Sequence, residues 1–170
     1  MRYTILIITL AFLGCARSLP PLRQGLARLT PARPQPPLST IDSLLSLALE
    51  QAVIHGVADF PPHSREVIIR NSPFASAHVL PRMDSVTFYI VDSAQIQTLA
   101  DRYGNVSYLL LGTTTMEADS ATAAIGNTFA IRRSPGRGPG VLMAGGGCYW
   151  ILRRRDGSWQ IERLGGCLIS

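Results

Sequence analysis

The chain has 170 residues, of which 46% are apolar and 16% charged, and its formal net charge is +5. This size and composition fit one small globular domain and exclude a long disordered chain or a multi-domain enzyme of ordinary size. Five Arg and no acidic residue precede residue 40, whereas eleven Arg balance eleven acidic residues from there onward. The part expected to fold is therefore neutral, which argues against a nucleic-acid-binding domain, because such a domain needs a basic face of its own.

The first fifteen residues combine a basic start, an apolar run over residues 3–13 and a small residue before Cys15. The run is shorter than the roughly 20 residues of a membrane span, but it suits the core of a secretory signal over residues 1–14. The sequence Phe12-Leu13-Gly14-Cys15 resembles the lipobox of bacterial lipoproteins, with Phe12 where Leu is usual. This resemblance implies cleavage before Cys15 and a lipid on its sulfur.

Lipidation of Cys15 would attach the protein to membrane lipid, which is therefore a predicted partner. Two or three acyl chains hold a protein on a membrane almost permanently without crossing it. Because Ala16 and not Asp follows the cysteine, the resemblance implies the outer membrane in a cell that has two. The alternatives are cleavage after Ala16, which gives a soluble exported protein, and an uncleaved anchor.

Residues 15–38 contain six of the twelve prolines, four Arg and no acid. Such a composition favours an extended polyproline II conformation and predicts a semi-rigid tether between the membrane and the domain. Its Arg side chains can pair with anionic headgroups, or they serve only to keep the linker solvated.

Residues 39–170 are expected to form the single folded domain. Ser39 and Asp42 approximate a capping box, and apolar residues then recur at helical spacing until Gly56. A second helix is predicted between Asp92 and Gly104. β-branched and aromatic runs predict short strands, then four successive strands that close with an Asp-Gly hairpin. These six strands are expected over residues 66–70, 86–91, 106–114, 121–132, 141–153 and 159–164.

This order predicts an α+β domain with two main helices packed on a curved, mostly antiparallel sheet that ends in a four-strand meander. The order of elements resembles the cone-shaped fold of nuclear transport factor 2 and ketosteroid isomerase, while a plain sheet with helices on one face is the alternative. The resemblance implies a small-molecule pocket or an isomerase or dehydratase site that uses an ionisable pair such as Tyr and Asp. Separately, the glycine-rich C-terminal run over residues 145–159 resembles the ending of small exported proteins of Bacteroidetes-type bacteria, which supply no activity.

If Cys15 is lipidated, Cys148 and Cys167 are the two unmodified cysteines. Export would place them in an oxidising environment, in which disulfides persist. A two-residue hairpin turn would put Cys148 opposite Gly165 and diagonal to Cys167, and a bulge at Gly165–Gly166 would bring the two sulfurs together. We therefore predict a disulfide. The alternatives are two buried thiols or a redox pair, against which the lack of a C-x-x-C spacing argues.

No catalytic or metal-binding pattern accompanies these features. His55, His63 and His78 lack a partner at ligand spacing, and His55 suits the dipole at a helix end. Residues 136–140 are rich in glycine but lack the preceding strand, the following helix and the Gly-Lys-Ser/Thr ending of a phosphate-binding loop. The three Arg at residues 153–155 suit a solvated strand edge better than an anion site. The sequence thus predicts a lipid-anchored envelope protein with a non-catalytic binding or structural domain and no cofactor, and an envelope protein is a further possible partner.

Overall fold

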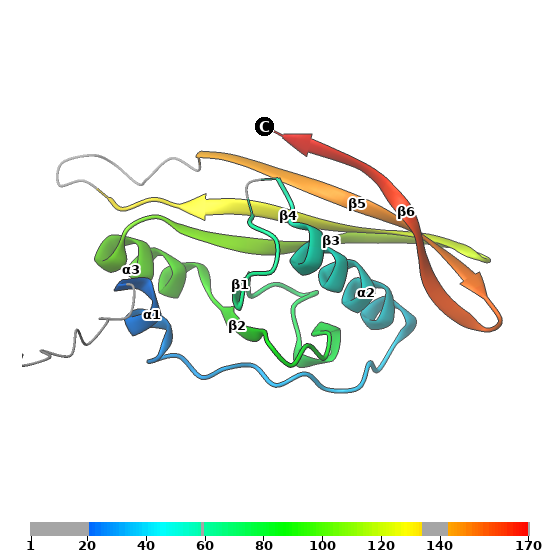
Figure 1. Cartoon of the computed structure of the whole chain (residues 1–170), viewed down its shortest axis with the longest axis horizontal. Coiled ribbons are helices and arrows are strands. Elements are labelled where there is room, and N and C mark those ends of the chain that lie inside the picture. Colours follow the sequence, from blue (N-terminus) through cyan, green and yellow to red (C-terminus); the bar gives the residue numbers. More distant parts are fainter. Residues whose placement is uncertain (1–20, 59, 134–142, 170) are drawn as a thin grey trace, which may run out of the picture.

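The computed structural model describes residues 21–58, 60–133 and 143–169 as an α+β domain (Figure 1). Its elements follow in this order: α1 (Pro21–Leu26), α2 (Thr40–His55), β1 (Glu66–Arg70), the 3-10 helix η1 (Ala77–Val79), β2 (Thr87–Val91), α3 (Ser93–Tyr103), β3 (Val106–Glu117), β4 (Ser120–Ala130), β5 (Met143–Arg155) and β6 (Ser158–Ile169). None of the helices in these ranges has the length and apolar character needed to cross a membrane.

Both long helices start where their caps predict. The Ser39 hydroxyl accepts a hydrogen bond from the Asp42 N–H at 3.1 Å, and the Asp42 carboxylate accepts one from the Ser39 N–H at 2.9 Å. Asp92 and Gln95 form the same reciprocal pair at the start of α3. These bonds satisfy backbone donors that have no partner inside a helix, so α2 and α3 begin as the sequence predicts.

The six strands form one curved sheet in the order β2-β1-β3-β4-β5-β6, and the last four form the predicted antiparallel meander (Figure 1). The fold class is therefore confirmed. The pairing of β1 with β2 differs from a simple hairpin, because the two strands are parallel. A parallel pair needs a crossover connection, and residues 71–86, which contain η1, provide it.

The sheet carries a hydrophobic cluster on each face. Successive side chains of a strand point to opposite faces, so Val67 and Ile69 of β1 join the cluster under α2 while Ile68 joins the cluster under α1 and α3. The α2 cluster extends along the meander to Leu152, which is fully buried. α2 thus covers one face from β1 to β5, and α1 and α3 cover the other face at β1, β2, the start of β3 and the end of β4.

The segment predicted to be a free tether instead lies against the domain from Pro21 onward. Residues 21–26 form α1, and Leu26 is only 2% exposed. Farther along, the Ala32 N–H donates to the Phe88 carbonyl at 2.8 Å, and the His78 Nδ1 lies 2.8 Å from the Pro36 carbonyl. These contacts hold the proline-rich segment to β2 and η1.

An ion pair ties the end of α3 to the chain that leaves β4. The Arg133 backbone N–H and Nε donate to Asp101 at 2.9 and 2.8 Å, and Arg133 Nη2 also contacts that carboxylate. These hydrogen bonds hold the pKa of the Asp101 carboxyl well below its usual range. The carboxylate therefore stays ionised at acidities that protonate an ordinary Asp.

We expect the free energy of unfolding of Asp101→Asn to fall less at acidic pH than that of the wild type. The pKa of Asp101 is lower in the folded protein than the value of about 3.9 in the unfolded chain, so its ionised form stabilises the fold. This stabilisation is fully present above the pKa of the unfolded state and is lost as the pH falls toward the pKa of the folded state. The wild-type protein should therefore lose more stability than the Asn variant below pH ~4. Thermal unfolding followed at neutral and acidic pH measures this. Asp84→Asn is the control, because Asp84 is exposed and forms no ion pair within the described ranges. If the Tm of the wild type and that of Asp101→Asn fell equally with decreasing pH, the prediction would be contradicted.

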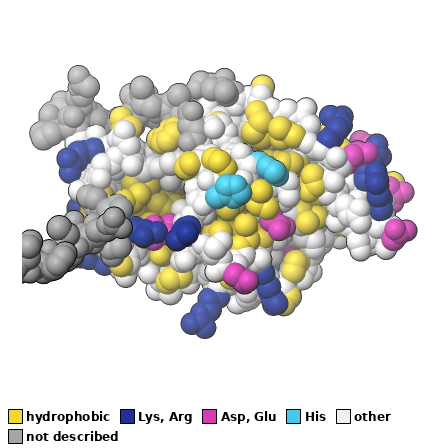
Figure 2. All heavy atoms as spheres, viewed as in Figure 1, with side chains coloured by type: hydrophobic (Ala, Val, Ile, Leu, Met, Phe, Trp, Pro, Cys, Tyr) yellow, Lys and Arg dark blue, Asp and Glu magenta, His cyan; other side chains and the backbone are white. Residues whose placement is uncertain are grey.

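The charges are unevenly spread over the surface. At the end that carries the β5–β6 turn, basic and acidic side chains alternate, whereas the middle of the same face is largely apolar or uncharged (Figure 2). Within this end, Arg153 pairs with Glu162 at 3.2 Å. Arg153 is in register with both β4 and β6, whereas Arg154 and Arg155 are in register with β6 alone. All three residues are exposed, as predicted, but β6 and not β5 is the edge strand of the sheet.

Candidate functional site

A cleft of about 450 Å³ lies between the C-terminal end of α2 and the strands β5 and β6. We call it the α2–β6 cleft. It is lined by Gln51, His55, Gly56, Ala58, Cys148, Trp150, Ile161, Arg163, Leu164 and Cys167. Its volume falls within the range of small-molecule pockets, which is roughly 300–1,000 Å³.

The floor of the α2–β6 cleft is apolar and mostly buried. Cys148 and Trp150 are each 4% exposed and belong to the hydrophobic cluster under α2, against which Ile161 packs. Leu164, at 51% exposed, extends the apolar surface toward the solvent. A ligand that covers these side chains would remove apolar area from water, which is the main favourable contribution to binding in such a cleft.

The mouth of the cleft carries three polar side chains. Gln51 and His55 are four residues apart in α2, so they lie on the same face of the helix, and Arg163 comes from β6. His55 and Arg163 are exposed, and Gln51 is half-buried. An amide, an imidazole and a guanidinium can all donate hydrogen bonds, and the guanidinium is permanently cationic. The mouth is therefore suited to an anionic group of a ligand.

Two bulges in β6 lie on either side of Arg163 and Leu164, which both line this cleft. The register of β6 against β5 shifts on both sides of the pair Arg163–Leu164, which leaves Glu162 and Gly165 unpaired. Between the bulges the pairing is regular, with Arg163 opposite Ile151 and Leu164 opposite Trp150.

The same two bulges bring the cysteines together. Cys148 pairs directly with Cys167 rather than with Gly165, and the two residues form a disulfide. The predicted disulfide and the predicted irregularity at Gly165 are thus confirmed. The predicted diagonal register is wrong, because the hairpin contains a second bulge at Glu162. The disulfide lies in the cleft wall.

A tight loop after α2 forms the rim of the cleft. The Val57 N–H donates to the Phe60 carbonyl and the Phe60 N–H returns a bond to Val57, at 3.2 and 2.8 Å. Gly56 has φ +80°, and a Cβ there would lie 2.7 Å from the Phe60 carbonyl oxygen, so only glycine fits. Ala58 also has positive φ, at +49°. Gly56 and Ala58 therefore line the cleft in backbone conformations that few side chains adopt.

The described lining of the α2–β6 cleft contains no Asp or Glu. General acid–base chemistry of the isomerase type needs a base within reach of the substrate, and in this lining the imidazole of His55 is the one side chain of that kind. The buried Tyr89 is the described tyrosine closest to that pattern, since burial and then the neighbouring Glu66 raise its pKa. Tyr89 belongs to the cluster under α3, however, and does not line the α2–β6 cleft.

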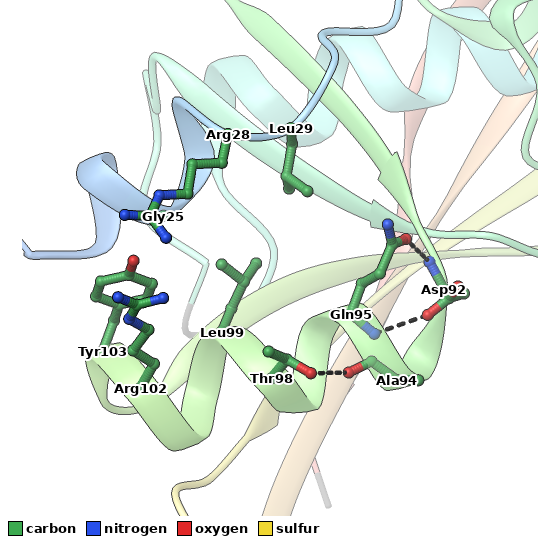
Figure 3. Close-up of a pocket in the computed structure, with 10 residues that line it drawn as sticks. All are labelled: Gly25, Arg28, Leu29, Asp92, Ala94, Gln95, Thr98, Leu99, Arg102 and Tyr103. Atoms are coloured by element: carbon green, nitrogen blue, oxygen red, sulfur yellow. Dashed lines mark hydrogen bonds between the residues drawn. The ribbon is translucent and has the colours of Figure 1, made fainter.

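A second cavity, of about 300 Å³, lies between α1 and α3 (Figure 3). We call it the α1–α3 groove. It is lined by Gly25, Arg28, Leu29, Asp92, Ala94, Gln95, Thr98, Leu99, Arg102 and Tyr103. Gly25 is required here, because a Cβ would lie 2.4 Å from Tyr103. The α1–α3 groove shares no lining residue with the α2–β6 cleft.

Of the remaining predicted site residues, the two that the structure describes, His63 and His78, line neither cavity. Cys15 and residues 136–140 lie outside the described residues. His63 is in a turn with φ +56°, and His78 holds the proline-rich segment through Pro36. In the described part of the chain, no three His, Cys, Asp or Glu side chains are grouped as a metal site would require.

Sequence analysis missed Arg163, Arg28 and Arg102. The register of β6 that brings Arg163 to the cleft has no local signature beyond Gly165–Gly166. For the α1–α3 groove a signal existed, since Leu22, Leu26 and Leu29 follow helical spacing after a proline suited to a first helical position.

These features define an α+β protein with a curved sheet and a ligand-sized cleft between a helix and the last two strands. No protein-family model and no curated protein matches the sequence. Among solved structures, the chain is similar to a nuclear transport factor 2-like protein with a cystatin-like fold from Novosphingobium aromaticivorans. The two share 20% identity over 73% of this chain and 69% of the other, with a TM-score of 0.25. This likeness is too distant to carry an argument about the site.

Proposed function

We propose that this protein is an exported lipoprotein anchored in the cell envelope through Cys15, and that its domain is a non-catalytic binding module. The ligand occupies the α2–β6 cleft. In a cell with two membranes the anchor lies in the outer one, as Ala16 implies. The observation that carries the binding function is the combination of an apolar floor at Trp150 with a cationic mouth at Arg163.

The lining of the cleft indicates the class of ligand. A small molecule with an apolar body would cover Trp150 and Ile161, and a carboxylate would accept hydrogen bonds from Arg163, with Gln51 and His55 as further donors. Hydrogen bonds to a charged group contribute about 1.5–3 kcal/mol. A neutral ligand of the same shape would lose this contribution.

Arg163→Gln tests the ligand site. The full chain carrying Cys15→Ser, which avoids detergent, is titrated with 4-tert-butylbenzoate by isothermal calorimetry, with 4-tert-butylbenzamide as the neutral analogue. We expect Arg163→Gln to weaken binding of the acid by about tenfold or more and to leave the amide unaffected. Arg154→Gln is the matched control, because Arg154 is an exposed residue of the same hairpin outside the cleft.

Two results would count against the binding site. One is a Kd for the acid that does not change in Arg163→Gln, and the other is an equal loss in Arg154→Gln. Anchorage has its own experiment, which is incorporation of labelled palmitate into the wild-type protein and not into Cys15→Ser. Palmitate labelling that persists in Cys15→Ser, or that is absent from both, would remove the anchor from the proposal.

A further inference from the structure

The chain between the proposed lipid and the domain is short. α1 begins at Pro21, so six residue steps separate it from Cys15. At about 3.3–3.6 Å per step, this stretch spans roughly 20 Å when fully extended. The residues after α1 are bound to the domain and add nothing to this reach, as the Ala32 bond to Phe88 shows. The end of the domain that carries α1 must therefore stay beside the bilayer.

That end of the domain contains the α1–α3 groove, which is apolar along its length and basic at one end. Leu29 and Leu99 lie along the groove, and Figure 3 shows the guanidinium groups of Arg28 and Arg102 at the end where Tyr103 lies. Arg102 sits over the Tyr103 ring, 5.5 Å from its centroid. Two like charges at one end repel each other unless an anion lies between them.

The acidic residues nearby do not neutralise these two cations. Arg28 and Arg102 form no ion pair with any described residue. Asp92 also lines the groove, but its carboxylate caps α3 through the Gln95 N–H at 2.7 Å. Asp101 is already occupied by Arg133. The groove therefore offers an unneutralised cationic end to any ligand.

We propose that the α1–α3 end of the domain docks on the bilayer surface, where the α1–α3 groove holds an anionic phospholipid. The phosphate lies between Arg28 and Arg102, and the upper part of an acyl chain lies along Leu29 and Leu99. This inference rests on the proposed anchorage at Cys15. It gives the short attachment a function, because docking fixes the orientation of the domain on the membrane.

The geometry and the charges favour a lipid over other occupants. The lipid surface is the one partner that a lipid on Cys15 would bring within about 20 Å of α1 at all times. Each Arg near an anionic surface gains about fivefold in binding, an effect that decays within a Debye length of about 8–10 Å. The opposite end of the domain mixes basic and acidic groups and offers no comparable attraction (Figure 2).

The test uses the mature lipidated full chain in vesicles of phosphatidylethanolamine and phosphatidylglycerol, with phosphatidylcholine vesicles as the neutral comparison. A fluorescent label is placed at Thr98→Cys in the groove, or at Ser158→Cys beside the β5–β6 turn. Both positions are exposed. Lipids that carry a doxyl quencher near the headgroup should quench the Thr98 label strongly in anionic vesicles and weakly in neutral ones. The Ser158 label should stay unquenched in both.

Charge reversal provides the matched variants. Arg28→Glu with Arg102→Glu should lower the ratio of docked to undocked protein by about tenfold or more in anionic vesicles. Arg154→Glu with Arg155→Glu changes the same number of charges at the opposite end and should have no effect.

Several outcomes would overturn the docking proposal. They are equal quenching at Thr98 and Ser158, quenching at Thr98 that is independent of phosphatidylglycerol, and equal losses in the two charge-reversal variants. A Thr98 label that is shielded from aqueous quencher but not reached by doxyl lipid would assign the groove to another protein or a second copy of this chain. If palmitate is incorporated and the protein floats with vesicles while the Thr98 label is unquenched, docking fails and the proposed anchorage stands. If palmitate is absent, the anchorage itself fails.

Discussion

Replacing Cys148 and Cys167 together by alanine should lower the free energy of unfolding by about 3 kcal/mol. The disulfide joins residues 19 apart in sequence, and in the chain-entropy model it restricts the unfolded chain by an amount set by that loop. For a domain of this size, the loss corresponds to a fall in Tm of roughly 10 °C. Thermal unfolding of the oxidised wild type and of the double variant measures it.

This substitution should also weaken the α2–β6 cleft, because both cysteines lie in its wall. We expect a lower affinity for 4-tert-butylbenzoate in the double variant at a temperature where both proteins are folded. Leu168→Ala is the control, since Leu168 is in the same strand and 79% exposed. Equal Tm values for the oxidised wild type and the double variant would show that the disulfide does not constrain the unfolded chain.

Leu49→Ala should cost about 2–5 kcal/mol, the range for truncating a fully buried leucine. Leu49 is 0% exposed in the middle of α2 and belongs to the cluster that joins this helix to the meander. The loss combines the transfer free energy of the deleted methyl groups with the cost of the cavity that they leave. Chemical denaturation would show a lower midpoint with an unchanged m value.

Ile41→Ala is the matched control for Leu49→Ala. Ile41 lies in the first turn of α2 and is 44% exposed, so its truncation should change stability much less. If both substitutions had the same small effect, α2 would not be packed against the sheet as the structure shows. Because Gln51 and His55 lie on the same helix, such a result would also remove the wall of the proposed cleft.

Local sequence patterns predicted most of the elements. The caps at Ser39 and Asp92 are interactions over three residues, so they are visible without tertiary structure. The Asp156–Gly157 turn likewise determines the β5–β6 hairpin, since Asp156 has φ +50° and Gly157 φ +78°, as a primed turn needs. Strand bounds differed most at the last strand, which stays paired with β5 as far as Ile169.

Features that depend on distant segments were not predictable in the same way. β1 and β2 have the same local pattern whether they pair in parallel or antiparallel. Their parallel pairing is selected by the crossover that packs η1 against α2. The Pro-rich composition of residues 20–37 favours an extended conformation in isolation, and burial of Leu26 under α3 overrides it.

By itself, the sequence determined the class of the domain, the starts of its two long helices, the four-strand meander and the pairing of its two downstream cysteines. Each depends on residues close together in the chain or on a cysteine count. Only the tertiary structure decided which side chains share a cavity. Strand pairing and helix packing bring Arg163 of β6 to the same cleft as His55 of α2, and the packing of α1 on α3 brings Arg28 and Arg102 to one groove. These placements follow from packing between segments far apart in sequence, where a shift of one residue changes the face that a side chain occupies.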